Sequence, residues 1–274
     1  MKLFRSLLVA AVLLSVTSPC GAADSSAIQA LVESNAAAVK NMSARRIASL
    51  TAIAEVAHIL DYFKAPESER KERLVQVKTS LKHADMGSEL CLIDNQGAEH
   101  LRVVNGRFAF DRELSKAESD APFFSPGMTL ASGQSYTSDA YLSPDVMEWV
   151  VGFVVPVIPG VAVLHYEYPI KEYSDILRAT KLDAKHFVLV VDRAGHVIAD
   201  SREAHVNKAV DPLTNPIDYF PSIRRGEGAL PAEVAHDVLS GNPGEAEVNW
   251  RGGRYRMAWQ TTDGLIIAAF EEAR

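Results

Sequence analysis

Cysteine is scarce in this chain of 274 residues, which contains only Cys20 and Cys91. Two cysteines are too few for the disulfide framework of a small secreted scaffold. Positive charge is also in deficit, because 28 Lys and Arg face 35 Asp and Glu and the formal net charge is −7. An acidic chain lacks the basic footprint of a nucleic-acid-binding protein, so nucleic acid is not an expected partner.

The sequence also lacks the short motifs that accompany common catalytic and metal sites. Its eight histidines show no His-Glu-x-x-His spacing, and it has no Gly-x-Ser-x-Gly nucleophile elbow and no glycine-rich phosphate loop. We therefore do not expect an enzyme, a bound metal ion or another cofactor.

No apolar run is long enough to cross a membrane without interruption. At the N-terminus, Lys2 and Arg5 precede a short apolar segment at residues 7–16, and small residues follow up to Ala23. These are the three regions of a secretory signal peptide, and the apolar segment is about half the length of a spanning helix. We expect cleavage after Ala23 and a mature protein that is periplasmic or secreted. An uncleaved membrane anchor and lipidation of Cys20 are the alternatives.

Residues 24–83 are predicted to be helical. Apolar residues at helical spacing around Leu50 form one stripe along a long helix at residues 25–64, which Pro66 ends. A shorter helix is expected at residues 67–83. The stripe can pack on a sheet of its own chain or form the seam of a homodimer. Its many alanines and incomplete heptads favour packing within the chain.

An internal repeat dominates the rest of the sequence. Residues 90–97 and 188–195 each consist of an apolar strand followed by Asp-x-x-Gly, and a second strand follows each of them. Asp and Gly suit tight hairpin turns, since Asp bonds its own turn backbone and Gly tolerates positive φ. Three more strand patterns follow in each copy. We therefore predict an α+β fold with two modules, residues 84–173 and 174–274, each containing a five-stranded antiparallel sheet. A helix at residues 171–179 enters the second module.

The order of these segments resembles the double Cache family, which consists of tandem PAS-like sensor domains outside the membrane that follow a long helix. The similarity is densest in the first module, where residues 97–103 are similar to the family's Gly-x-Glu-x-x-Arg-Val strand. Residues 122–124 and 130–142 resemble its Tyr-Phe helix and the Gly-x-x-Tyr-x-Ser strand that follows. The resemblance implies that the protein senses a small molecule in its first, membrane-distal module.

The chain departs from the family's pattern in two respects. The last predicted strand ends at Phe270, four residues before Arg274, and no second membrane segment or output domain is expected after it. We therefore expect a free-standing exported protein that presents its ligand to a membrane receptor or kinase. The amino-acid-binding subgroup carries an Arg-x-Trp-Tyr motif, which residues 119–124 replace with Ser-Asp-Ala-Pro-Phe-Phe. Amino-acid binding through that motif is not expected.

A candidate ligand site is predicted on the sheet of the first module. Arg102, on the second strand, can hold a carboxylate by a bidentate contact, which favours an organic anion as the ligand. Alternation gives Asp139 and Tyr141 one face of their strand. It likewise gives His165 and Glu167 one face of the last strand, while aromatic residues supply apolar walls. The candidate site comprises Arg102, Phe124, Asp139, Tyr141, Trp149 and His165.

Each candidate residue also has a purely structural interpretation. Arg102 can pair with Glu99 or Asp139, and the aromatic residues can belong to the hydrophobic core. The corresponding functional hypothesis is an interaction protein that binds no ligand and pairs with a membrane receptor through its long helix.

Overall fold

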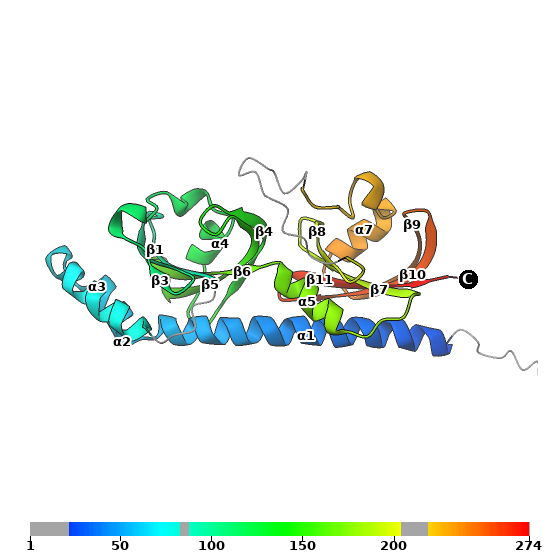
Figure 1. The fold of residues 1–274 in the computed structure, drawn as a ribbon, viewed down its shortest axis with the longest axis horizontal. Coiled ribbons are helices and arrows are strands. Elements are labelled where there is room, and N and C mark those ends of the chain that lie inside the picture. Colours follow the sequence, from blue (N-terminus) through cyan, green and yellow to red (C-terminus); the bar gives the residue numbers. More distant parts are fainter. Residues whose placement is uncertain (1–21, 83–87, 204–218, 274) are drawn as a thin grey trace, which may run out of the picture.

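The computed structural model describes residues 22–82, 88–203 and 219–273. Two antiparallel sheets lie one after the other along a single long helix (Figure 1). Most of the predicted signal peptide lies outside the described residues, so its cleavage stays a prediction. Among the described helices, none combines the length and the apolar composition that crossing a membrane requires.

The N-terminal helices are α1 (Ala22–Ala54), α2 (Ala57–Lys64) and α3 (Glu67–Leu81). The prediction of one uninterrupted helix at residues 25–64 was wrong at Val56, whose backbone is extended (φ −61°, ψ 121°). This break redirects the chain, so that α2 packs its buried residues Ile59 and Tyr62 against the first module. The hydroxyl of Tyr62 lies 2.5 Å from Nδ1 of His100, on the second strand of that module.

The first sheet has the strand order β3-β2-β1-β6-β5-β4. It contains one strand more than predicted, because Asn105 and Gly106, both with positive φ, form a two-residue hairpin turn that pairs a short extra strand with its neighbour. Asn-Gly is a strong signal for such a turn. The strands are β1 (Glu89–Asp94), β2 (Glu99–Val104), β3 (Arg107–Phe108), β4 (Tyr136–Ser143), β5 (Glu148–Ile158) and β6 (Ala162–Pro169).

The second sheet has five strands in the order β8-β7-β11-β10-β9, which repeats the order of the first sheet without β3. Helix α5 (Lys171–Ala179) enters this module at the predicted position, and α7 (Ala232–Leu239) packs beside β9. The strands are β7 (His186–Val191), β8 (Val197–Asp200), β9 (Gly244–Trp250), β10 (Gly253–Thr262) and β11 (Leu265–Glu272). The two predicted modules are therefore confirmed as two separate sheets of the same topology.

The two Asp-x-x-Gly turns have the predicted chemistry. Asp94 Oδ1 accepts backbone N–H groups of Gln96 and Ala98 at 2.8 and 3.0 Å, and Asp192 Oδ1 accepts that of His196 at 2.8 Å. The turn glycines, Gly97 and Gly195, have φ of 79° and 89°. Predicted module boundaries stay predictions: residues 83–87 are not described, and the second boundary falls within α5.

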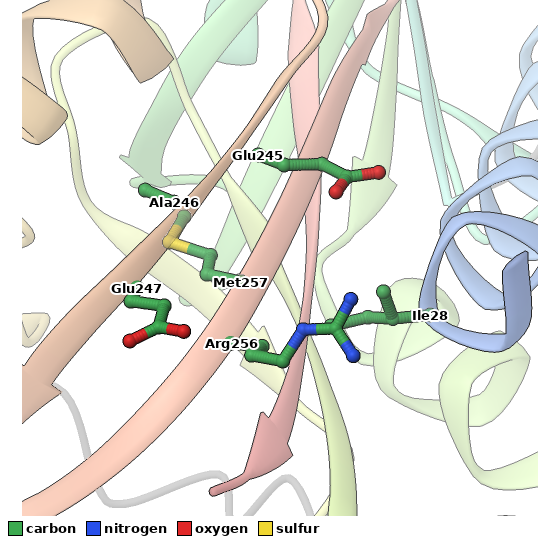
Figure 2. Close-up of a pocket in the computed structure, with 6 residues that line it drawn as sticks. All are labelled: Ile28, Glu245, Ala246, Glu247, Arg256 and Met257. Carbon is green, nitrogen blue, oxygen red and sulfur yellow. The ribbon is translucent and has the colours of Figure 1, made fainter. Parts of the chain in front are cut away.

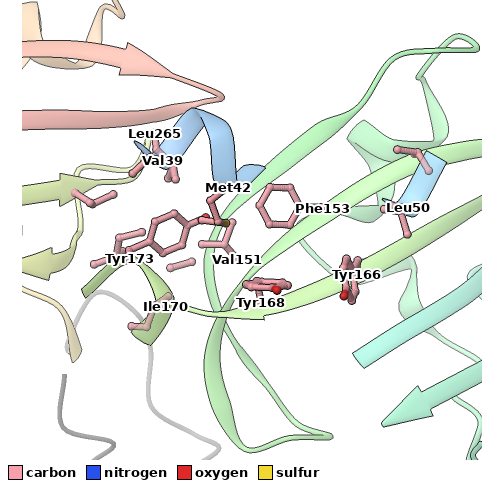
Figure 3. Close-up of a cluster of buried hydrophobic side chains, with 14 of the residues drawn as sticks. Val39, Met42, Leu50, Val151, Phe153, Tyr166, Tyr168, Ile170, Tyr173 and Leu265 are labelled. Carbon is pink, nitrogen blue, oxygen red and sulfur yellow. The ribbon is translucent and has the colours of Figure 1, made fainter. Parts of the chain in front are cut away.

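Helix α1 packs its apolar stripe on both sheets, against β5 and β6 of the first and β10 and β11 of the second. The stripe is thus used within the chain, as favoured above. Short α4 (Phe124–Met128) covers the opposite face of the first sheet, where it contacts β5 and β6. Single 3₁₀ turns occur at Asp111–Glu113, Glu118–Asp120 and Gly226–Gly228. Figure 3 shows the core on the α1 side, whose labelled members are Val39, Met42, Leu50, Val151, Phe153, Tyr166, Tyr168, Ile170, Tyr173 and Leu265.

Candidate functional site

The face of the first sheet that α4 covers carries a cluster of buried polar side chains. Glu89 lies directly opposite Glu167 across the β1–β6 pair, and Cys91 lies opposite His165. Because residues two apart on a strand share a face, all four side chains point toward α4. None is more than 3 % exposed. We call the face of the first sheet that carries these four side chains the polar face.

A hydrogen-bonded chain crosses the polar face from β4 to β6. Tyr141 Oη lies 2.8 Å from His165 Nε2 and donates to Glu167 Oε1, also at 2.8 Å. Burial lowers the pKa of His165 to about 3, so its imidazole is neutral and its Nε2–H donates to the tyrosine. Gly152 makes room for this arrangement, because a Cβ there would lie 2.8 Å from His165 Nε2.

Aromatic residues from the segment around α4 close the polar face. The Phe123 ring stacks on the His165 ring with centroids 3.5 Å apart, and Phe124 is buried in the same apolar cluster as Cys91. Gly127 of α4 allows a close approach, since a Cβ there would lie 2.7 Å from a methyl group of Val154. The face is therefore shielded from solvent by tightly packed side chains.

Carboxylates accumulate at the β1–β2 side of the polar face. Glu89 Oε1 accepts a hydrogen bond from the Cys91 thiol at 3.1 Å, and Glu99 lies beside both. Burial raises the pKa of Glu89, and the neighbouring charge of Glu167 raises it further. Burial likewise raises the pKa of Glu167. Within the described residues, no N–H or O–H group of another residue donates to the buried Oε2 atoms of Glu89 and Glu167, and the two carboxyl groups can bond to each other when one of them holds a proton.

Arg102 is the cation of this cluster, and its guanidinium already has protein partners. Nη1 lies 2.6 Å from Asp145 Oδ2 and 3.5 Å from Glu99 Oε2, and Nη2 donates to the carbonyl oxygen of Glu113. The sequence analysis gave Glu99 and Asp139 as possible structural partners of Arg102. Glu99 is such a partner, but the second acidic partner is Asp145 and not Asp139. The guanidinium is therefore already paired with two acidic side chains, Glu99 and Asp145, within the protein.

Two predicted site residues lie elsewhere. An irregularity in β4 between Thr137 and Ala140 takes Asp139 off the face of Tyr141. Its Oδ1 instead accepts the backbone N–H of Arg193, in the second module, at 3.1 Å. Asp139 therefore joins the two modules.

Trp149 lies on the other face of the first sheet. It belongs to the α1-side core, and its ring centroid is 4.7 Å from that of Tyr219. Sequence alternation could not assign this face, because β5 is buried along almost its whole length on both sides. The structure thus brings together Arg102, Phe124, Tyr141 and His165.

The sequence analysis missed Glu89, Cys91 and Glu99 as members of a site. Glu89 and Cys91 share one face of a strand that is otherwise apolar up to Asp94 at its end, which is the same pattern that drew attention to His165 and Glu167. A charged side chain inside a fully buried strand indicates a paired or functional group. This signal was present at Glu89 and was not used.

A hollow of about 200 Å³ in the second module lies between the N-terminal part of α1 and the strands β9 and β10 (Figure 2). Its charges are matched within the protein, because Glu247 pairs with Arg254 at 2.5 Å and Arg256 lies 3.5 Å from Glu271. It is therefore a weaker candidate than the polar face. Its lining residues are Ile28, Glu245, Ala246, Glu247, Arg256 and Met257.

No family model matches the chain, and no curated protein matches it. Solved structures of sensory domains do match. The ligand-binding domain of the Campylobacter jejuni chemoreceptor Tlp3, in complex with L-norvaline, is 12 % identical, with a TM-score of 0.63, and the match covers 93 % of this chain and 94 % of that one. The ligand-binding domain of the Pseudomonas aeruginosa PAO1 amino-acid chemoreceptor PctB, in complex with L-Arg, is 13 % identical, with a TM-score of 0.58 and coverages of 90 % and 94 %.

The extracellular domain of the histidine kinase mmHK1S-Z2 is 11 % identical, with a TM-score of 0.64, and the match covers 91 % of this chain and 97 % of that one. At such low identities these likenesses establish the fold alone. The chain has the double-Cache-type fold of sensory domains, with a long helix followed by two antiparallel sheets.

Proposed function

We propose that this protein is an exported sensor, not an enzyme, which captures a small positively charged molecule in its first module and presents it to a membrane-bound chemoreceptor or kinase. The observation that carries the proposal is the polar face, where the adjacent carboxyl groups of Glu89 and Glu167 are buried and neither forms a salt bridge with a described residue. The N-terminal signal-peptide pattern supports export. The similar structures, all sensory domains, support the sensor role.

The charge of the ligand follows from the cost of burying carboxylates. A buried carboxylate is stable only when it is protonated, hydrogen-bonded or paired with a cation. A cationic ligand would supply the missing partner for Glu167, and Tyr141 would orient that carboxylate. The domains of Tlp3 and PctB were solved with amino acids, whose ammonium group has the required charge.

A thermal-shift screen of residues 24–274 tests this function. Amines and amino acids should raise the melting temperature, and a ligand at 100 times its Kd adds about 2.7 kcal/mol to the free energy of unfolding. Organic acids should not raise it. Glu167→Gln should abolish the shift, whereas the control Glu247→Gln, at a surface ion pair, should retain it. Stabilisation by organic acids alone would contradict the proposal.

One observation favours a second function, in which the protein binds no ligand. Phe123 stacks directly on His165, and α4 lies close to the sheet, so the polar face is already closed. The outer face of α1, with exposed Lys40 and Arg45, would then contact a receptor or a second copy of the chain. Sedimentation of the wild type and of Arg45→Glu tests the homodimer. A ligand-induced shift in the screen would argue against this alternative.

A further inference from the structure

We infer that the second module has a ligand site of its own, a hollow beside α7 that binds the phosphate group of a small phosphate monoester. The hollow has a volume of about 480 Å³, which lies within the range of roughly 300–1,000 Å³ for small-molecule sites. It is separate from the polar face, which lies in the first module. The inference therefore goes beyond the proposed function and does not depend on it.

The hollow lies on the face of the second sheet that is opposite α1, where α7 covers the strands (Figure 1). Its inner wall is apolar, because Leu230 and Ala235 are buried members of the hydrophobic cluster on this face and Leu239 packs against that cluster. An apolar wall with a few convergent polar groups is typical of a small-molecule site. Three exposed side chains with nitrogen donors also line the hollow, namely Arg193, Arg224 and His236.

The charges of the lining favour an anion. No carboxylate of a described residue lines the hollow, although α7 also carries the exposed Glu233 and Asp237. The hollow beside Ile28 in the same module differs in this respect, since Glu245 and Glu247 line it. A cationic hollow is a local exception in a chain with a net charge of −7, and it would attract a negatively charged ligand.

Arg224 is an unpaired cation on a fixed backbone. Its guanidinium has no ion pair and no hydrogen bond with any residue that the structure describes. The backbone around it is held in place, because the N–H of Ile223 donates to the carbonyl oxygen of Gly195 at 2.9 Å and the N–H of Arg224 donates to Ser222 Oγ at 3.1 Å. The side chain packs on Gly195, where a Cβ would lie 3.0 Å from Arg224 Cγ. An arginine held in this way can bind an oxyanion through two parallel N–H groups.

The number of positive and donor groups decides the kind of anion. Arg193 adds charge beside the hollow, although its Nη1 donates to the carbonyl oxygen of Thr137 and lies 3.8 Å from Asp139 Oδ1, which offsets part of that charge. The imidazole of His236 has no partner among the described residues and can donate from the same lining. A carboxylate has one charge and two oxygens, whereas a phosphate monoester has three terminal oxygens and a charge of about −1.5 to −2. The lining therefore fits a phosphate monoester, whose organic group would lie on the apolar wall.

Phenyl phosphate is a suitable probe, and amide NMR spectra of the isotope-labelled mature chain locate its binding. We expect saturable shifts of the amide signals of Gly195, Arg224 and His236. Arg224→Gln should weaken binding about tenfold or more, because it removes a charged hydrogen-bond donor. The matched control is Arg254→Gln, at an exposed arginine of the same module that pairs with Glu247, and it should bind phenyl phosphate as the wild type does.

Benzoate and benzylamine carry a similar ring and test the class of ligand. Benzoate should bind the hollow more weakly than phenyl phosphate, and benzylamine should not shift its amide signals. Equal binding of benzoate would overturn the phosphate assignment, and shifts of the same signals by benzylamine would overturn the preference for an anion.

The variants test whether the hollow is a site at all. An unchanged affinity in Arg224→Gln, or equal weakening by Arg254→Gln, would overturn the inference. Shifts that do not saturate and that spread over exposed arginines would mean an adventitious ion only, which also overturns it. If Arg224→Gln does not fold, His236→Gln replaces it, and an unchanged affinity in that variant has the same consequence.

Discussion

Arg102 shows how one side chain can resemble a ligand-binding group while serving the fold. Arg102 is 7 % exposed, and its acceptors belong to three different segments: β2, the 3₁₀ turn at Asp111–Glu113 and the loop between β4 and β5. Glu99, one of these acceptors, is also buried. Removing the arginine would leave that carboxylate without its cation, which is costly because water cannot replace the lost partner.

We therefore predict that Arg102→Ala lowers the free energy of unfolding by about 3 kcal/mol, the lower end of the range for breaking a buried ion pair. Urea unfolding followed by circular dichroism measures this. The matched control is Arg254→Ala, whose pair with Glu247 is more than 60 % exposed on both sides and should cost at most about 1 kcal/mol. Equal stabilities of the two variants would show that Arg102 is not a structural group.

The glutamates of the polar face should make stability depend on pH. The pKa of Glu167 is raised to about 7 and that of Glu89 to about 9, from the ordinary value of 4.5. Between 4.5 and these values the folded state holds protons that the unfolded state has released, so the free energy of unfolding falls as pH rises. His165, with its lowered pKa, acts in the opposite sense, but only below about 6.5.

We predict that the wild type loses stability from pH 6.5 to pH 9. Glu89→Gln should lose less over this interval, because an amide has no proton to release. Urea midpoints at several pH values measure the difference. The control Glu247→Gln should follow the wild-type curve, since Glu247 is exposed and its pKa is lowered. A wild-type midpoint that does not change with pH would contradict the buried carboxyl pair.

At the scale of the element, α4 depends on one small residue. Gly127 faces Val154 of β5 so closely that an added methyl group would overlap a valine methyl at 2.7 Å. The glycine has no positive φ, so the requirement is for space and not for backbone conformation. The same helix brings Phe123 and Phe124 over the polar face.

We predict that Gly127→Ala lifts α4 from the sheet and unstacks Phe123 from His165. Overpacking of this kind costs roughly 1–3 kcal/mol. Amide hydrogen exchange should increase on β5 and on the segment around α4, while β9 to β11 in the second module should keep wild-type protection. Faster exchange throughout both modules would mean that the change acts on global stability alone.

The regular elements were predictable because their patterns are local. Apolar periodicity predicted the long helix, and the two Asp-x-x-Gly turns, with alternation on either side, predicted paired strands in both modules. The family resemblance indicated the short helix near Phe124, whereas the order of the strands within each sheet was not predicted.

Details that depend on tertiary contacts were not predictable. The break at Val56 serves the packing of α2, and the irregularity in β4 turns Asp139 toward Arg193 of the other module. The face of Trp149 was hidden because a strand that is buried on both sides has no polar alternation to interpret. The candidate site was predicted in part: Tyr141 and His165 were recognised as polar residues in apolar strands, whereas Glu89, Cys91 and Glu99 were not.

At the scale of the whole molecule, α1 joins the two modules into one structure. It packs against strands of both sheets, and Asn35 Oδ1 accepts the hydroxyl of Thr180, just after α5, at 2.8 Å. Direct contacts between the modules add to this, because Arg193 Nη1 donates to the carbonyl oxygen of Thr137 at 2.6 Å. A change in one module can therefore be transmitted through shared packing to the other.

We predict that the two modules unfold in a single cooperative transition, since neither can lose its packing on α1 without exposing the apolar stripe under the other. The three tryptophans divide between the modules: Trp149 lies in the first, and Trp250 and Trp259 lie in the second. In Trp149→Phe, fluorescence reports the second module alone; in the double variant Trp250→Phe, Trp259→Phe, it reports the first. Within each variant, the fluorescence midpoint in urea should coincide with the far-ultraviolet circular dichroism midpoint, which averages over the whole chain. Because both midpoints are measured on the same variant, the stability lost by the substitution affects them equally. Separate midpoints in either variant would mean that the modules unfold independently, and α1 would then be a tether between two domains instead of a shared part of their core.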